Sequence, residues 1–95
     1  MNFEEFRTEL EIELKTLIKF ELQEFSYHPY SFGDGFLGYR INGKCFRLTY
    51  EGRERQLRVD CSEPHEKYFG ATWSELEIFD ELSTSSRGVA VLLAN

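Results

Sequence analysis

Asn42 and Gly43 separate two segments, 36–41 and 44–50, in which apolar residues alternate with polar ones. Asparagine and glycine tolerate the two positive φ angles of a type I′ turn, a common two-residue connection in β-hairpins. Such a short loop fixes the strand register, because it leaves the flanking residues only one way to pair. The predicted pairs are Ile41 with Lys44, Tyr39 with Phe46, and Leu37 with Leu48. The apolar residues of both strands then share one face, so the sequence predicts a hairpin with one buried side.

A second hairpin extends the first. Residues 51–54 (EGRE) form the predicted loop, and residues 55–61 return as a third strand in which Tyr50 faces Arg55. The pairs that follow are Leu48 with Leu57 and Phe46 with Val59. The same face therefore stays apolar across three strands. The predicted core face comprises Leu37, Tyr39, Ile41, Phe46, Leu48, Leu57 and Val59.

Residues 3–24 are predicted to form an amphipathic helix that covers this face. Asn2 is a suitable N-cap, and Glu4 and Glu5 suit the first turn because they complement the helix dipole. From residue 18 onward apolar and polar residues also alternate, so the end of this segment is compatible with an extended strand as well. The apolar stripe of the helix comprises Phe3, Phe6, Leu10, Leu14, Leu17, Ile18 and Phe25.

Two further segments flank the predicted strands. Residues 25–32 (FSYHPYSF) are aromatic and are predicted to be extended. Pro29 lacks an N–H, so this segment belongs at the edge of a sheet. Residues 62–69 are predicted to form a short helical turn, with Ser62 as its cap and Gly70 as its end.

The C-terminal third of the chain is predicted to be mostly helical. Thr72 and Glu75 match the capping-box pattern, so a helix is expected over residues 73–82. Residues 89–93 are too short to assign by periodicity, and both strand and helix stay open. The fold class that follows is α+β, with an N-terminal helix packed on a three- to four-stranded antiparallel meander, followed by a C-terminal helix. Residues 1–95 are expected to form a single domain.

The charge of the chain is segregated. The net charge is −6, distributed as −4 over residues 1–24, +2 over residues 25–60 and −4 over residues 61–95. An acidic balance argues against general nucleic-acid binding and against binding to an anionic membrane surface. The acidic start, MNFEEFRTEL, does not resemble a signal peptide, and no apolar run is long enough to cross a membrane. With only two cysteines in addition, a cytoplasmic location is expected.

The basic residues of the predicted sheet share one face. Arg40, Arg47 and Arg58 point away from the apolar side, and the predicted register places Arg47 directly opposite Arg58. Like charges that face each other across a ladder destabilise it unless negative charge compensates them. Three interpretations stay open: the arginines are solvated or pair with Asp60 and nearby glutamates, an acidic helix of the same chain covers them, or they bind an anionic partner.

The sequence contains no convincing catalytic or metal site. Cys61 and His65 lie close together, but only Cys45 and His28 remain to complete a zinc site or a cysteine–histidine pair. The predicted register puts the two cysteines on opposite faces, which also disfavours a disulfide between them. Residues 33–38 match GxGxxG, but a strand follows them rather than the helix of a dinucleotide site. No enzyme activity, metal or cofactor is therefore predicted.

The order of helix, three strands and helix resembles that of a double-stranded-RNA-binding domain. That family contacts phosphates through lysines at the start of its last helix. Here the corresponding region, residues 72–82, contains no lysine and instead carries Glu75, Glu77, Asp80 and Glu81. Binding of nucleic acid or phosphate through the arginine-bearing face therefore stays an alternative, less favoured than binding to a protein.

The favoured hypothesis is a non-enzymatic protein-binding module. Small acidic proteins of this kind act as inhibitors, immunity proteins or accessory factors that occupy a partner's surface. The predicted partner-binding residues are Arg40, Arg47, Arg58, Tyr27 and Tyr30, because arginine and tyrosine are enriched at protein interfaces. The expected partner is another protein, or a second copy of the chain that closes an open edge of the sheet.

Overall fold

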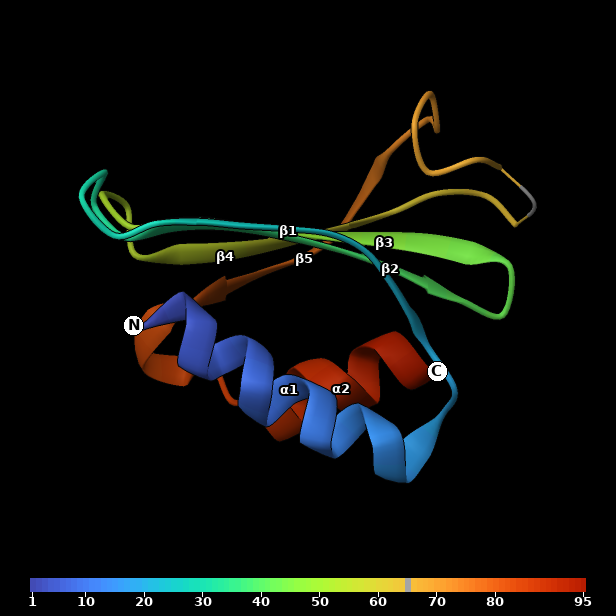
Figure 1. Cartoon of the computed structure of the whole chain (residues 1–95), viewed down its shortest axis with the longest axis horizontal. Coiled ribbons are helices and arrows are strands. Elements are labelled where there is room, and N and C mark those ends of the chain that lie inside the picture. The colour runs from blue at the N-terminus through green and yellow to red at the C-terminus, as the bar shows by residue number, and fades with distance from the viewer. Residues whose placement is uncertain (65) are drawn as a thin grey trace.

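The computed structural model describes residues 1–64 and 66–95, and its strands form one antiparallel sheet in the order β1-β2-β3-β4-β5. Both helices lie against the same face of the sheet, which we call the inner face, and the opposite side is the outer face (Figure 1). The elements are α1 (Phe3–Leu17), β1 (Glu21–His28), β2 (Asp34–Ile41), β3 (Lys44–Glu51), β4 (Gln56–Cys61), β5 (Ser74–Asp80), the 3₁₀ helix η1 (Glu81–Ser83) and α2 (Ser86–Ala94).

The predicted fold class is confirmed: an N-terminal helix, an antiparallel meander and a C-terminal helix form an α+β fold. The sheet has five strands rather than three or four. The two helices pack against each other beneath the sheet, and their apolar residues complete the core. All seven residues of the predicted core face are buried, together with Tyr50.

Helix α1 begins as predicted and ends earlier. The Asn2 side chain accepts hydrogen bonds from the backbone N–H groups of Glu4 (3.0 Å) and Glu5 (3.1 Å). The helix ends at Leu17 rather than at residue 24, and the extended alternative for the end of this segment is confirmed, because residues 21–28 form strand β1. The alternation in this segment reflects a strand that turns its apolar side chains toward the inner face. The side chains of β1 that pack against the core are Leu22, Phe25 and Tyr27.

The first predicted hairpin is confirmed in full. Strands β2 and β3 pair in the predicted register, and Asn42 and Gly43 adopt positive φ angles of 52° and 76°. These angles match the type I′ geometry that the sequence indicates.

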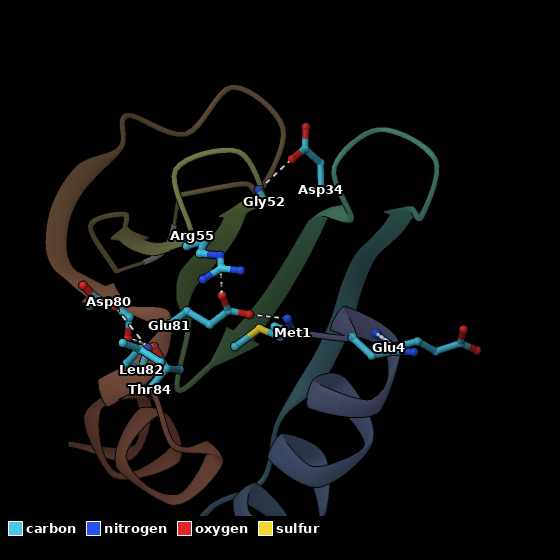
Figure 2. Close-up of polar contacts among 10 residues, drawn as sticks. Met1, Glu4, Asp34, Gly52, Arg55, Asp80, Glu81, Leu82 and Thr84 are labelled. Carbon is cyan, nitrogen blue, oxygen red and sulfur yellow. Dashed lines mark hydrogen bonds and ion pairs between the residues drawn. The ribbon is translucent and has the colours of Figure 1, made fainter.

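The second hairpin forms, but its predicted register is wrong by two residues. The observed pairs are Tyr50 with Leu57, Leu48 with Val59, and Phe46 with Cys61. A shift of two keeps every side chain on its predicted face. The loop lies one residue further along the chain than predicted, at residues 52–55, and Arg55 adopts a positive φ of 54° within it. Gly52 donates to the Asp34 carboxylate (2.8 Å), a contact with the neighbouring loop that no local pattern reveals (Figure 2).

The predicted helix over residues 73–82 is wrong, because residues 74–80 form the edge strand β5. Strand β5 pairs with β4 and places Phe79 across from Leu57 on the inner face. The hydrogen bonds and side-chain contacts along β4 outweigh a local helix signal that is worth little without tertiary packing. Leu82, near the end of this segment, lies in η1 and is 93% exposed.

Other parts of the C-terminal half also differ from the prediction. Residues 66–70 contain a bend and a turn instead of a helix, and Ser62 accepts a hydrogen bond from the Cys45 N–H (3.0 Å) rather than capping a helical turn. The segment left open, 89–93, belongs to helix α2. Its N-cap is Ser85, whose hydroxyl accepts from the Gly88 N–H (3.0 Å).

Candidate partner-binding surfaces

The predicted arginines lie on the outer face, on three neighbouring strands. Cross-strand pairing places Arg58 and Arg47 in two adjacent rows of residues, and each row runs across all the strands of the sheet. One row contains Ser26, Phe36, Thr49, Arg58 and Ile78. The next row contains Glu24, Gly38, Arg47, Asp60 and Glu75.

The predicted juxtaposition of Arg47 and Arg58 is wrong, since Arg47 lies opposite Asp60. Asp60 is only 5% exposed and pairs with both arginines. Its Oδ2 atom is 3.2 Å from Nε of Arg58 and 3.8 Å from Nη2 of Arg47. Burial of a carboxylate requires such compensation. The sheet therefore resolves the expected repulsion by placing one buried acid between two arginines.

Residues 66–73 fold over part of the outer face, and we call this segment the strap (Figure 1). The Arg47 guanidinium lies 4.5 Å from the centre of the Trp73 ring and 5.7 Å from that of Phe36, so it is held between two aromatic side chains. Tyr68 of the strap is buried above Gly38, where any Cβ would overlap its ring. Arg47 is thus covered by an aromatic segment and not by an acidic helix, whereas the side chain of Arg58 is 41% exposed.

The Tyr68 hydroxyl lies in a low-dielectric environment. Burial, and then the neighbouring Glu24 carboxylate, raise the pKa of this phenol above its ordinary value. Within normal hydrogen-bond geometry the hydroxyl has no partner among the described residues, nor do Nε of Arg47 and the Thr49 hydroxyl. Packing of the ring against Gly38 and Trp73 therefore holds the strap in place, rather than a hydrogen bond from its phenol.

Arg40 lies at the far end of the outer face, where it pairs across the strands with Glu21 and Cys45. Its Nη1 atom contacts the Cys45 thiol sulfur at 3.8 Å. The outer rows that hold the arginines also hold four acids: Glu21, Glu24, Asp60 and Glu75. The arginine-bearing face is therefore compensated in charge, which weakens its attraction for a phosphate backbone. Nucleic-acid binding through it stays a prediction.

The cysteines lie on opposite sides of the sheet and are both free thiols, as expected. Cys45 is buried on the outer face, and its thiol contacts the backbone carbonyl of Glu66 at 3.7 Å. Cys61 is half-buried and packs against the inner core. Residues 1–64 and 66–95 contain no cluster of three or more metal-ligating side chains. The predicted pairing of Cys61 with His65 lies outside the described residues.

The two predicted tyrosines have opposite environments. Tyr27 is half-buried against the core, so little of its ring is presented to a partner. Tyr30 is fully exposed in the loop between β1 and β2, and Phe32 in the same loop is 64% exposed. This loop, residues 29–33, lies beside the loop of residues 52–55 at one end of the sheet (Figures 1 and 2). We call the two loops together the aromatic tip.

Close contacts join the loops of the aromatic tip. The Asp34 carboxylate accepts from the Gly52 N–H, and Gly52 packs so tightly on the Phe32 carbonyl that a Cβ would overlap it. Phe32 adopts a positive φ of 56°, which is unusual for a bulky residue. The Arg53 guanidinium lies 4.7 Å from the centre of the Phe32 ring. Neither Phe32 nor Arg53 is among the residues predicted from the sequence to bind a partner, because their proximity depends on the pairing of two separate hairpins.

The tip is also tied to the start of the C-terminal region. Glu81 accepts from the N-terminal ammonium of Met1, and its other oxygen lies 3.6 Å from Nε of Arg55 (Figure 2). The hydrogen bond from the N-terminus, with help from Tyr50 and Arg55, lowers the pKa of Glu81 although burial opposes the shift. An open groove of about 420 Å³ adjoins this carboxylate and is lined by Met1, Asn2, Glu5, Phe6, Glu9, Glu81, Thr84, Ser85 and Ser86.

Comparison with known proteins gives no assignment: no family model, curated protein or solved structure matches the chain. Among the described residues, no helix combines the length and the apolar character that a membrane span requires.

Proposed function

We propose that this protein is a non-enzymatic protein-binding module that acts by occupying the surface of a larger protein, in the manner of an inhibitor, immunity protein or accessory factor. The aromatic tip is its main contact surface. The observation that carries the proposal is the exposure of Tyr30 and Phe32 on one loop, which is held by contacts with the neighbouring loop of residues 52–55.

The composition of the tip supports a role in binding. Tyrosine and arginine are the residue types most often found at the energetic centre of interfaces, and the tip presents Tyr30 and Arg53 beside Phe32. Exposed apolar side chains that are grouped, rather than scattered singly, are typical of interaction sites.

The rigidity of the tip supports the same conclusion. The contacts of Gly52 with Asp34 and Phe32 order the loops before any partner arrives, so binding costs less conformational entropy. The positive φ of Phe32 is local strain of the kind that is retained at functional positions.

The surroundings of Cys45 support a non-enzymatic role. Cys45 is buried beneath the strap, where its thiol contacts the Glu66 carbonyl and the Arg40 guanidinium rather than a general base. A nucleophilic thiol requires access and an activating base.

Site-specific photo-crosslinking tests the proposal. A photoreactive phenylalanine analogue at position 30 should capture one protein at stoichiometric yield from a lysate of the source cells. The same analogue at position 12 is the matched control, because Ile12 is 59% exposed on α1, away from the tip. Tyr30→Ala and Phe32→Ala should each weaken recovery of the captured protein at least tenfold. Equal capture from positions 30 and 12, or capture of nucleic acid that is lost as salt rises, would contradict the proposal.

A further inference from the structure

Strand β5 is an edge strand with one side unpaired among the described residues. Residues 74–78 are all exposed, and Ile78 is 45% exposed on the outer face beside Arg58. An edge strand presents a row of backbone N–H and C=O groups that another strand can pair with. The segment contains neither proline nor glycine, which would weaken such pairing.

The opposite edge of the sheet is less exposed, because residues 22–27 of β1 are all partly buried whereas residues 74–78 of β5 are exposed. Strand β1 has a register irregularity between Leu22 and Glu24, so a bulge interrupts its ladder. Pro29 follows directly after its last residue, His28. Strand β5 has its own irregularity near Leu76, but residues 77–80 pair regularly with β4. Residues 77–80 are thus the regular part of β5 from which a further strand can extend the sheet.

The charges of β5 restrict what can pair with it. Its ionisable side chains are Glu75, Glu77 and Asp80, and it carries no basic residue. Pairing of β5 with the same strand of a second copy would bring these acids together, and like charges across a ladder are destabilising. A strand that carries lysine or arginine at the facing positions would instead pair favourably, with apolar residues beside Ile78 and Phe79.

We infer that β5 accepts an added β-strand from a partner protein, and that the added strand carries basic residues facing Glu75, Glu77 and Asp80 and apolar residues facing Ile78 and Phe79. Backbone hydrogen bonds supply the affinity in this mode, and the facing side chains supply the selectivity. The site is separate from the aromatic tip, and it does not depend on the function proposed for the tip.

A peptide pair provides the test. The probe is acetylated and amidated Lys-Val-Val-Lys-Val-Lys, whose antiparallel alignment places lysines across from Asp80, Glu77 and Glu75. Its matched control replaces each lysine with glutamate. At 0.15 M salt and a probe concentration ten times its Kd, amide exchange of residues 74–80 should slow about tenfold, because only the free protein then exchanges. The glutamate peptide should slow none of these amides.

A charge swap sharpens the test. The double variant Glu75→Lys/Glu77→Lys changes exposed side chains only, and it should prefer the glutamate peptide over the lysine peptide. The inference is overturned if the lysine peptide leaves exchange of residues 74–80 unchanged. It is also overturned if the peptide perturbs the exposed acids Glu5 and Glu9 of α1 as strongly as β5. A wild-type dimer joined through β5 at neutral pH would exclude it as well.

Discussion

The two faces of the sheet differ in the residues that they carry and in the segments that cover them. The centre of the inner face is apolar, and two helices with buried apolar residues cover it. The outer face mixes arginines, acids and aromatic residues, and only the strap lies over it. Apolar packing is non-directional and depends on area, whereas the contacts of the outer face depend on individual pairs.

Because of this difference, the inner face contributes most of the stability, and the outer face tolerates more change. On the inner face many buried side chains each contribute to stability through apolar packing, and truncation of any one of them leaves a cavity. On the outer face two arrangements dominate: Tyr68 over Gly38, and Asp60 between two arginines. The outer face and the strand edges are consequently the parts of the sheet that can change without loss of the fold.

The largest expected effect is on the inner face. Leu48→Ala, at a fully buried position of β3, should lower the free energy of unfolding by about 3 kcal/mol, because it removes buried methyl groups and leaves a cavity. Ile78→Ala on the outer side of β5 should cost less than about 1 kcal/mol, since Ile78 is already 45% exposed. Urea unfolding of both variants measures the difference. Equal losses would show that the outer face contributes as much burial as the inner one.

The second prediction concerns the strap. Gly38→Ala should destabilise the protein by about 2 kcal/mol, because the new Cβ overlaps the Tyr68 ring. Trp73 is the only tryptophan in the chain and packs edge-to-face on Tyr68, so its fluorescence reports displacement of the strap. The double variant Gly38→Ala/Tyr68→Ala should cost less than the sum of its single changes. Additive costs, with unchanged fluorescence, would mean that the strap does not depend on this contact.

Local patterns were sufficient for the inner face. The alternation in β2 and β3 and the Asn42-Gly43 turn determine the first hairpin, because both strand faces and the loop length are encoded in neighbouring residues. In the second hairpin, local patterns do not determine the register. Its loop position depends on contacts of Gly52 with Asp34 and Phe32, which belong to a different hairpin. The predicted face of each side chain in β4 is still correct, because the register differs from the prediction by an even number of residues.

The structure of the outer face and of edge strand β5 depends on contacts between residues that are distant in the sequence. Residues 73–82 carry a capping-box pattern and helical spacing, yet pairing with β4 makes most of them a strand. The same register change that placed Asp60 opposite Arg47 removed the predicted repulsion between arginines. Among the residues predicted to bind a partner, Tyr30 belongs to an aromatic segment that contains proline, and the structure places it in an exposed loop. Arg53, in contrast, reaches Phe32 only through tertiary structure.

The third prediction tests the compensation on the outer face. Asp60→Asn keeps the shape of the side chain and removes its charge, so Arg47 and Arg58 lose their shared counter-ion. The expected loss of stability is about 1 kcal/mol, reduced from the value of a fully buried pair because both arginines are partly exposed. Glu75→Gln, which neutralises the exposed neighbour of Asp60 in the same row, should change stability by less than about 0.5 kcal/mol. A smaller effect for Asp60→Asn than for Glu75→Gln would contradict the central role of Asp60.

The smallest expected effect lies where the edge of the sheet meets the helices. Glu81 follows β5 directly and contacts the N-terminal ammonium and Arg55, and these contacts hold its pKa below the ordinary value of 4.5. A carboxyl whose pKa is lowered by folding stabilises the folded state above its unfolded pKa, and this contribution is lost as pH falls through the folded value. Glu81→Gln should therefore reduce stability slightly at pH 7 and not at all well below pH 4.

The same substitution has a second, spectroscopic consequence. Burial, followed by Glu81, raises the pKa of Tyr50 to about 12. Removal of the Glu81 charge should lower that pKa only in part, because burial is the larger cause. Urea unfolding at several pH values and the absorbance of tyrosinate at high pH measure the two effects. Glu9→Gln is the control, since Glu9 lines the same groove and forms no ion pair among the described residues. If the stability difference between wild type and Glu81→Gln did not shrink as pH falls, then Glu81 would act through packing and not through its charge.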